Sequence, residues 1–233
     1  MGCYFQGPIP SSFSNLTYLT SLNLVESNLN GSIPSSLSNL QHLTHLDLSG
    51  NRLKGSIPSS FSNLHHLTYL DLSSNRLGGQ IPNVFDRLTN LQTLFLQNCG
   101  IQGPISSSFS NLTYLTSLNL MRNQLNGSIP SSLLNLHHLT HLDLSWNEIS
   151  GQIPNVFDRL TNLQTLSLSG CSLLSLESET SVNYTFSNLE ELELLSNNII
   201  GYSKFSGNFP KLEYLDLSNN KLAGKSKYVN SQV

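Results

Sequence analysis

The sequence predicts an α/β repeat solenoid, a right-handed superhelix with a concave parallel β-sheet and an irregular or 3-10 convex side. Leucine supplies 46 of the 233 residues, and the leucines return at a fixed interval of 24 residues. Within each interval an L-x-L triplet alternates apolar and polar residues, which is typical of a short strand with one buried face. This composition and this period indicate stacked structural repeats.

The repeating unit reads L-x-x-L-x-x-L-x-L-x-x-N-x-L-x-G-x-I-P. Seven leucines open consecutive units: Leu16, Leu40, Leu64, Leu88, Leu112, Leu136 and Leu160. So short a strand does not fold alone, but one strand from each unit builds a parallel sheet whose inner face is a continuous column of leucine. Two later units begin at Phe186 and Phe209 and lack the G-x-I-P ending.

The residues after each strand predict how a coil closes. In the second unit these are Asn51, Gly55 and Pro58. The Asn amide can bond backbone groups that would otherwise be buried unpaired. Glycine supplies backbone freedom and proline removes a hydrogen-bond donor, so the chain is expected to bend there toward the outer side.

The repeat also sets the expected domain boundaries. We expect one domain over residues 1–233, with a partial repeat at 1–15, regular 24-residue repeats at 16–159, irregular repeats at 160–224 and a non-repeat tail at 225–233. No capping unit is recognisable at either end, and solenoids normally need caps because terminal coils expose apolar surface. The chain is therefore interpreted as a fragment that lacks both caps.

Composition excludes several classes of protein. Only 11% of the residues are charged and the formal net charge is −3, so the chain is neither a basic nucleic-acid binder nor a disordered acidic segment. No apolar stretch approaches the ~18 residues of a membrane span, and no signal segment opens the chain. Any membrane attachment would come from segments outside this sequence.

The three cysteines stand where the repeat has its Asn. Cys99 and Cys171 lie three coils apart, roughly 14 Å at the usual strand spacing, and Cys3 lies four coils before Cys99. A disulfide requires Cα atoms within ~7 Å. We therefore expect buried free thiols in place of Asn.

No pattern predicts catalysis. Walker loops, H-E-x-x-H, G-x-S-x-G and the kinase motifs are absent, and the D-L-S triplets recur as part of the repeat. His45 with Asp47, and His141 with Asp143, could hold a metal ion only with a third ligand that the spacing does not supply. The remaining histidines, just before the strands, are interpreted as polar surface. We expect no enzyme, no cofactor and no metal.

Comparison of the chain with itself points to the exposed strand face. Residues 7–24 recur at 103–120, and residues 65–94 recur at 137–166. The copies keep the buried frame but differ at several positions predicted to face solvent on the strands. Neutral drift is one explanation. The other is ligand recognition, because the changes place aromatic residues and Arg, which often dominate binding energy, on one concave face. We favour recognition, with these ligand-binding candidates: Glu26, His45, Tyr69, Phe95, Gln97, Met121, Arg122, His141 and Trp146.

Five N-x-S/T sequons are glycosylation candidates. They lie at Asn15, Asn30, Asn111, Asn126 and Asn183, and none is at a predicted concave position. Glycans there would leave the concave face open. Four of the five also follow from the repeat consensus itself.

The L-x-G-x-I-P form of the unit resembles the plant-specific leucine-rich repeat family. Gly31–Pro34, Gly79–Pro82, Gly127–Pro130 and Gly151–Pro154 carry the resemblance, and the S-N-L-E-E-L and F-P-K-L-E-Y-L runs resemble the ectodomains of plant receptor-like proteins and leucine-rich repeat receptor-like kinases of the immune type.

The resemblance implies non-enzymatic recognition of a peptide or protein in defence or developmental signalling, with a co-receptor kinase as a further partner and no role for nucleic acid. It also implies a place at the extracellular face of the plasma membrane or in the apoplast. Two alternatives stay open: a secreted inhibitor of a pectin-degrading hydrolase, and a truncated gene remnant without a ligand.

Overall fold

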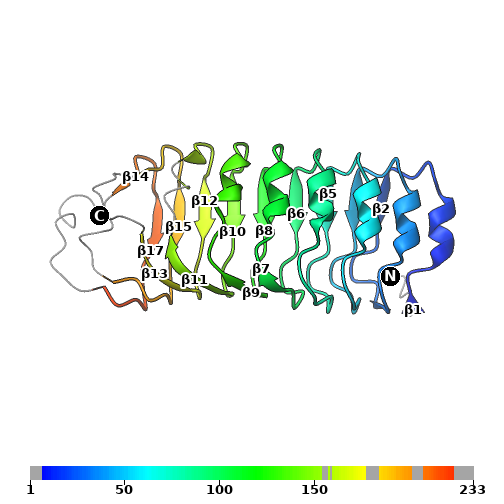
Figure 1. Ribbon diagram of the computed structural model, residues 1–233, viewed down its shortest axis with the longest axis horizontal. Helices are drawn as coiled ribbons and strands as arrows, with labels where there is room; N and C mark the ends of the chain where they lie inside the picture. Colours follow the sequence, from blue (N-terminus) through cyan, green and yellow to red (C-terminus); the bar gives the residue numbers. More distant parts are fainter. Residues whose placement is uncertain (1–6, 154–156, 158, 177–183, 201–206, 223–233) are drawn as a thin grey trace.

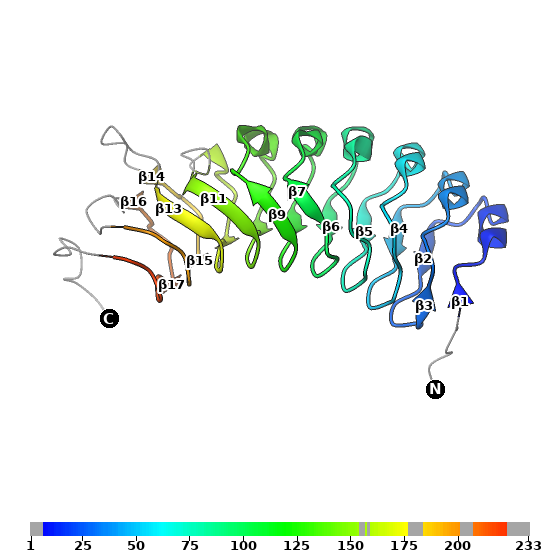
Figure 2. The ribbon, with the colours of Figure 1, turned by 60° about the horizontal axis from the view of Figure 1, so that its bottom comes forward.

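The computed structural model describes residues 7–153, 157, 159–176, 184–200 and 207–222. Successive coils stand side by side in one curved row, with the N-terminal coils at one end and the C-terminal coils at the other (Figure 1). Figure 2 shows the row as an arc with the 3-10 helices along its outer side. The expected solenoid is confirmed.

One parallel sheet runs the length of the arc, and each of its strands is the L-x-L triplet of one coil. Its strands are β2 (Ser21–Asn23), β4 (His45–Asp47), β5 (Tyr69–Asp71), β6 (Thr93–Phe95), β8 (Ser117–Asn119), β10 (His141–Asp143), β12 (Thr165–Ser167), β15 (Glu191–Glu193) and β17 (Tyr214–Asp216). They lie in chain order, so every strand pairs with the corresponding strand of the next coil. The middle leucines pair with one another, as Leu46 does with Leu70, and form the predicted buried column.

Short 3-10 helices occupy the convex side. They are η1 (Ser11–Asn15), η2 (Ser35–Asn39), η3 (Ser59–Asn63), η4 (Asn83–Arg87), η5 (Ser107–Asn111) and η6 (Ser131–Asn135). A proline precedes five of them, at the expected bend, in an extended conformation that fixes the entry of the chain. Ser106 takes that place before η5, and its hydroxyl accepts a hydrogen bond from the Ser108 N–H.

A second parallel sheet, which the sequence analysis did not predict, lies along the N-x-L-x-G-x-I segments. It contains β7 (Gln102–Pro104), β9 (Gln124–Gly127), β11 (Glu148–Ile153) and β13 (Ser172–Leu176). Two pairs of short strands stand toward the ends, β1 (Gly7–Pro8) with β3 (Leu29–Asn30) and β14 (Tyr184–Thr185) with β16 (Gly207–Asn208). Single bridges join Ser32 to Lys54 and Lys54 to Arg76, so the pairing continues through the intervening coils.

The core is a stack of similar layers. Leucines from the strands meet Phe or Leu from the 3-10 helices, and Phe85 and Phe109 contact each other edge to face with centroids 5.2 Å apart. The terminal described coils are less covered, because Leu16 is 51% exposed and Leu215 is 44% exposed.

Buried asparagines tie neighbouring coils together, as predicted. Asn51 donates from Nδ2 to the carbonyls of Leu24, Leu48 and Ser49, and its Oδ1 accepts the N–H groups of Ser27 and Leu29. One side chain thus bonds backbone groups on two adjacent coils, and the Leu48 carbonyl also accepts from Asn75 of the next coil.

Candidate functional site

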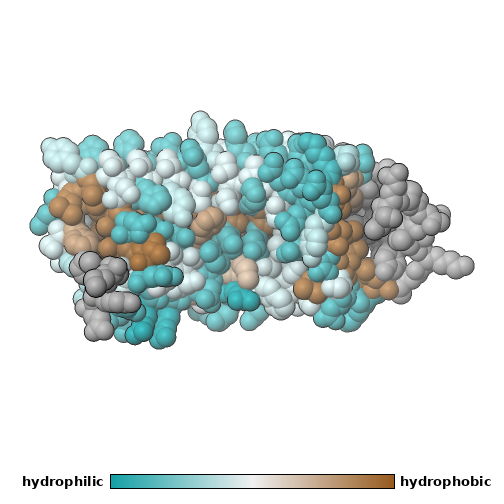
Figure 3. All heavy atoms as spheres, turned by 180° about the vertical axis from the view of Figure 1, so that it is seen from behind, coloured by the Kyte–Doolittle hydropathy of each residue, from teal (hydrophilic) through white to brown (hydrophobic). Residues whose placement is uncertain are grey.

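The first and third residues of each strand lie on the concave side of the sheet, opposite the middle leucine. In β5 the first of these, Tyr69, is half-buried, while Leu70 and Asp71 are buried. Because the register is constant, each concave position becomes a column that crosses the sheet. Seen from the side opposite to Figure 1, the molecule is mostly hydrophilic, with hydrophobic patches near both ends and a smaller one between them (Figure 3).

Three rings lie side by side on β4, β5 and β6. His45 stacks on Tyr69 with centroids 4.2 Å apart, and Tyr69 meets Phe95 edge to face at 6.1 Å. The structure thus brings together three of the candidate residues as one aromatic cluster. Burial raises the pKa of Tyr69 to about 12, and the nearby carboxylates of Asp71 and Asp47 add to that shift.

Carboxylates gather on the other half of the sheet, from β10 to β15. A groove of about 300 Å³ lies there, and Asp143, Glu191 and Glu193 line it together with His141. Glu193 Oε2 accepts the hydroxyl of Ser167 at 2.7 Å. Burial is the largest cause of the raised pKa of Asp143, and the charge of Glu193 acts in the same direction. None of the nine strands of this sheet contains Lys or Arg.

The recurring D-L-S triplets have a structural role. Asp47 Oδ1 accepts both the N–H and the hydroxyl of Ser49, at 3.0 and 2.7 Å, and Asp143 and Asp216 do the same for Ser145 and Ser218. These contacts stabilise the turn after each strand. They agree with the interpretation of the triplets as part of the scaffold.

Three candidates do not lie on strands, which corrects the sequence analysis. Glu26, Arg122 and Trp146 each follow the end of a strand by three residues and have positive φ angles of 49°, 54° and 56°. The chain turns sharply at these residues, but their backbone N–H groups still donate to the next coil. The Trp146 N–H, for example, donates to the Ser169 carbonyl at 2.7 Å. These side chains therefore form a separate column at the edge of the concave face.

Gln97 and Met121 are also beyond the strand ends, by two residues, and are half-buried. The Met121 N–H donates to Asn119 Oδ1 at 2.9 Å, which is the same turn contact that Asp makes elsewhere. Both residues lie between the strands and the edge column formed by Glu26, Arg122 and Trp146.

Cys99 and Cys171 are free and buried, as predicted. Cys99 Sγ lies 3.1 Å from the Leu72 carbonyl, where the Asn of other coils donates. Burial raises the pKa of Cys99 to about 12 and that of Cys171 to about 11. Cys3 lies outside the described residues.

Four of the five sequons fall on exposed residues away from the concave sheet. Asn15 and Asn111 end η1 and η5, and Asn30 and Asn126 belong to β3 and β9. Asn183 lies outside the described residues. Glycosylation at these sites remains a prediction.

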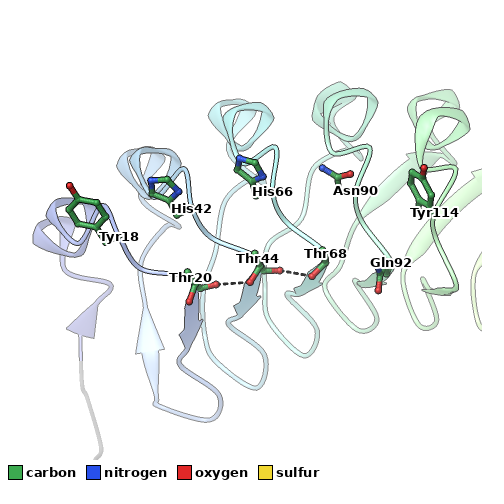
Figure 4. Close-up of a pocket in the computed structure, with 9 residues that line it drawn as sticks. All are labelled: Tyr18, Thr20, His42, Thr44, His66, Thr68, Asn90, Gln92 and Tyr114. Atoms are coloured by element: carbon green, nitrogen blue, oxygen red, sulfur yellow. Dashed lines mark hydrogen bonds between the residues drawn. The ribbon is translucent and has the colours of Figure 1, made fainter.

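A groove on the flank of the solenoid escaped the sequence analysis. It has a volume of about 760 Å³ and lies between the 3-10 helices and the starts of the strands (Figure 4). Its lining residues are Tyr18, Thr20, His42, Thr44, His66, Thr68, Asn90, Gln92 and Tyr114. The sequence analysis interpreted His42 and His66 as polar surface. The one sequence feature that could have indicated the groove is their fixed position, two residues before the Thr that precedes each strand.

Two further kinds of feature are absent from the part of the chain that the structure describes. No group of three or more metal-ligating side chains is found among the described residues. Within the same ranges, no helix has the length and apolarity that a membrane crossing requires.

A parallel concave sheet with one L-x-x-L-x-L-x-x-N coil per strand defines a leucine-rich repeat solenoid. The chain belongs to the leucine-rich repeat family, since the family model described as "Leucine-rich repeat region" matches residues 6–231. No curated protein sequence matches the chain.

Several solved structures are similar to it. The plant peptide hormone receptor RGFR1, in complex with RGF2, has a TM-score of 0.83 and 34% identity, over 93% of this chain and 34% of that chain. The Arabidopsis receptor kinase HAESA, in complex with the peptide hormone IDA and the co-receptor SERK1, has a TM-score of 0.83 and 36% identity, over 93% of this chain and 36% of that chain. A plant ice-binding protein has a TM-score of 0.75 and 31% identity, over 94% and 70% of the two chains.

The chain therefore spans about a third of the length of the two receptor chains. The similarity to plant receptor-kinase ectodomains agrees with the family resemblance that the repeat motif carries.

Proposed function

We propose that this chain belongs to the extracellular region of a plant receptor-like protein and recognises a peptide or protein ligand on its concave face, without catalysis, in defence or developmental signalling. The two receptors similar to it are peptide hormone complexes, and the HAESA complex also contains a co-receptor. The proposal accordingly includes a co-receptor kinase as a second partner.

The observation that carries the proposal is an aromatic cluster on β4 to β6 that lies beside an acidic groove on the concave face. His45, Tyr69 and Phe95 provide adjacent rings, and Asp143 and Glu193 provide carboxylates a few strands away. Aromatic residues commonly anchor ligands, and uncompensated carboxylates attract cations.

The ligand that fits this face is an extended peptide with an apolar or aromatic segment and at least one basic residue. Its apolar segment would lie on the aromatic cluster, and its basic residue would reach the carboxylates of β10 and β15. A cation there offsets the cost of keeping Asp143 ionised next to Glu193. The candidates Glu26, Arg122 and Trp146 would contact the ligand from the edge column.

Affinity selection followed by calorimetry tests this assignment. Peptides retained from apoplastic fluid by the full chain are sequenced, synthesised and titrated against wild type, Tyr69→Ala and Glu193→Gln. We expect each variant to weaken binding at least about tenfold, a loss of ~1.4 kcal/mol. Glu190→Gln is the matched control, because Glu190 precedes β15 and lies off the concave face.

The loss of affinity caused by Glu193→Gln should be smaller at high salt, because salt screens the attraction between the Glu193 carboxylate and a basic residue of the peptide. Equal affinities for wild type and both concave variants would refute the proposal. Retention of a pectin-degrading hydrolase in place of a peptide would favour the inhibitor alternative.

A further inference from the structure

The flank groove consists of two parallel rows of side chains. Figure 4 shows Tyr18, His42, His66, Asn90 and Tyr114 in one row below the 3-10 helices, and Thr20, Thr44, Thr68 and Gln92 in a second row at the starts of the strands. Each of the first four coils contributes one residue to each row, and the fifth contributes Tyr114 to the upper row. The groove therefore repeats its chemistry once per coil along the solenoid axis.

The upper row begins and ends with exposed rings. Tyr18 is 88% exposed and Tyr114 is 56% exposed. Tyr18 and His42 are nearly parallel, with an interplanar angle of 4° and centroids 6.0 Å apart, and Tyr114 and His138 are also stacked, at 5.8 Å but inclined by 29°. Exposed tyrosine rings combine an apolar face with a polar tip.

Hydrogen bonds to the preceding coil hold two threonines of the lower row. Thr44 Oγ1 donates to the Thr20 carbonyl and Thr68 Oγ1 donates to the Thr44 carbonyl, both at 3.0 Å. The same ladder continues beyond the groove at Thr116 and Thr140. Because each hydroxyl hydrogen points along the ladder, the oxygen lone pairs and methyl groups remain for a ligand.

The flank carries no formal charge over its whole regular length. The five-residue segments between the 3-10 helices and the strands contain no Asp, Glu, Lys or Arg in any of seven consecutive coils: 16–20, 40–44, 64–68, 88–92, 112–116, 136–140 and 160–164. Glu190, Lys211 and Glu213 interrupt this pattern only in the later irregular coils. The concave sheet, by contrast, carries carboxylates on most of its strands.

One duplicated block keeps the flank while it changes the concave side. Between residues 65–94 and 137–166 the differences include Tyr69 to His141 and Ser74 to Trp146. The flank pairs of this block are identical: His66 and His138, Thr68 and Thr140, Asn90 and Asn162, and Gln92 and Gln164. In the other block, residues 7–24 and 103–120, the flank residues and the strand residues are both identical.

We propose that this groove is a second binding site, separate from the concave face, for an extended uncharged oligosaccharide. Imidazole, amide and phenol groups of the upper row would hydrogen-bond sugar hydroxyls, and the two tyrosine rings would pack against the apolar faces of sugar rings. A linear β-linked glycan advances by about one coil for each sugar, so successive sugars would meet successive coils. Tyr18 and Tyr114 are four coils apart, roughly 19 Å at the usual strand spacing, which spans several sugars.

A protein partner fits this groove less well. Stable protein interfaces have a contiguous apolar centre, whereas the two tyrosines of this groove stand at opposite ends with polar side chains between them. The absence of formal charge also favours a neutral ligand over an acidic one.

Glycan titration tests the proposal. The full chain is titrated with cellohexaose, laminarihexaose and a galacturonic acid hexamer. It is made without N-glycans, because the sequons Asn15 and Asn111 lie three residues before Tyr18 and Tyr114. We expect one neutral hexamer to bind, its disaccharide to bind much more weakly, and Tyr18→Ala and Tyr114→Ala each to reduce affinity at least about fivefold.

Tyr69→Ala is the matched control, because it removes a tyrosine from the concave face and should leave glycan affinity unchanged. Both flank tyrosines are exposed, so their replacement should not affect folding, which thermal unfolding verifies. Conversely, Tyr18→Ala should leave peptide binding intact, so a failure of this site is distinct from a failure of the concave site.

Three results would overturn the proposal: no binding of either neutral hexamer at millimolar concentration, binding that both tyrosine variants retain, or binding of the charged hexamer alone. Inhibition of ice growth without glycan binding would also overturn the proposal. It would assign the threonine ladder to ice binding, the property named for the similar plant ice-binding protein.

Discussion

Trp146 lies directly over Gly170 of the next coil. A Cβ atom on Gly170 would stand 2.5 Å from Trp146 Cε3, so the indole occupies the space that any larger residue would need. In the other copy of the duplicated block, the equivalent residues are Ser74 and Asn98. Trp146 beside Gly170 in one copy thus corresponds to two polar residues, Ser74 and Asn98, in the other.

This contact predicts a coupled substitution. Gly170→Ala introduces a side chain at a φ of +65° and displaces the indole, so we expect a loss of about 2 kcal/mol in unfolding free energy. Trp146 is the only tryptophan, so its fluorescence should shift to longer wavelength as the ring becomes more exposed. Gly100→Ala is the control, because Gly100 has a φ of +71° and no atom within 4 Å of its Cβ position. If both variants lose equal stability, the indole contact is unimportant.

The buried asparagines predict a large loss when one is removed. Asn147 donates to the carbonyls of Leu120 and Leu144 and accepts the Leu125 N–H. Asn147→Ala leaves the Leu125 N–H without its partner and removes one of two donors from the Leu120 and Leu144 carbonyls, which should cost ~2 kcal/mol in urea unfolding. Asn147→Cys should cost less, because Cys99 shows that a thiol can occupy this place. Equal losses for Ala and Cys would contradict a bonding role for the thiol.

The two kinds of Asp predict opposite pH effects. Burial raises the pKa of Asp143, so the folded state holds this proton more tightly than the unfolded state, and ionisation at neutral pH destabilises the fold. Asp143→Asn should therefore raise the thermal midpoint at neutral pH, with the gain fading as the pH falls toward ~4, the ordinary carboxyl pKa. Asn119 already fills the same position and bonds the Met121 N–H, so the turn should survive.

Asp216 is the matched control for that experiment. Its pKa is lowered by hydrogen bonds from Ser218, so its ionised form favours folding above the ordinary carboxyl pKa and loses this effect in acid. Asp216→Asn should lower the midpoint slightly at neutral pH. A shift of the same sign for both variants would contradict these pKa directions.

The buried thiols predict resistance to alkylation. The pKa values of about 12 for Cys99 and 11 for Cys171 leave almost no thiolate at neutral pH. In a Cys3→Ser background, iodoacetamide should label neither thiol in the native chain and both in urea, as mass spectrometry would show. Rapid native labelling would mean that the coils open locally.

The sequence predicted the parts of the fold that depend on one residue type at one spacing. The leucine at the middle of each strand acts through burial, the Asn after most strands acts through hydrogen bonding between adjacent coils, and the Pro before five of the 3-10 helices acts through its restricted backbone. The second sheet was missed because the N-x-L-x-G-x-I motif is nearly the same in every coil, although its pairing varies from full strands to single bridges.

The candidate site was predicted less completely. His45, Tyr69 and Phe95 follow from strand alternation, but Arg122 and Trp146 were placed on strands because the sequence does not show where the backbone turns left-handed. The flank groove was missed because its upper row varies between Tyr, His and Asn. Only the stacking of coils reveals that these side chains line one surface.

The constant register between coils has a further consequence for the gene. A whole unit could be inserted or deleted between β4 and β12 and each remaining strand would still meet an equivalent neighbour, as Leu46 meets Leu70. Unequal recombination between near-identical blocks such as 7–24 and 103–120 would lengthen or shorten the protein by entire turns without disturbing the reading frame. Descendants of such events would inherit an intact scaffold and a newly ordered array of surface side chains.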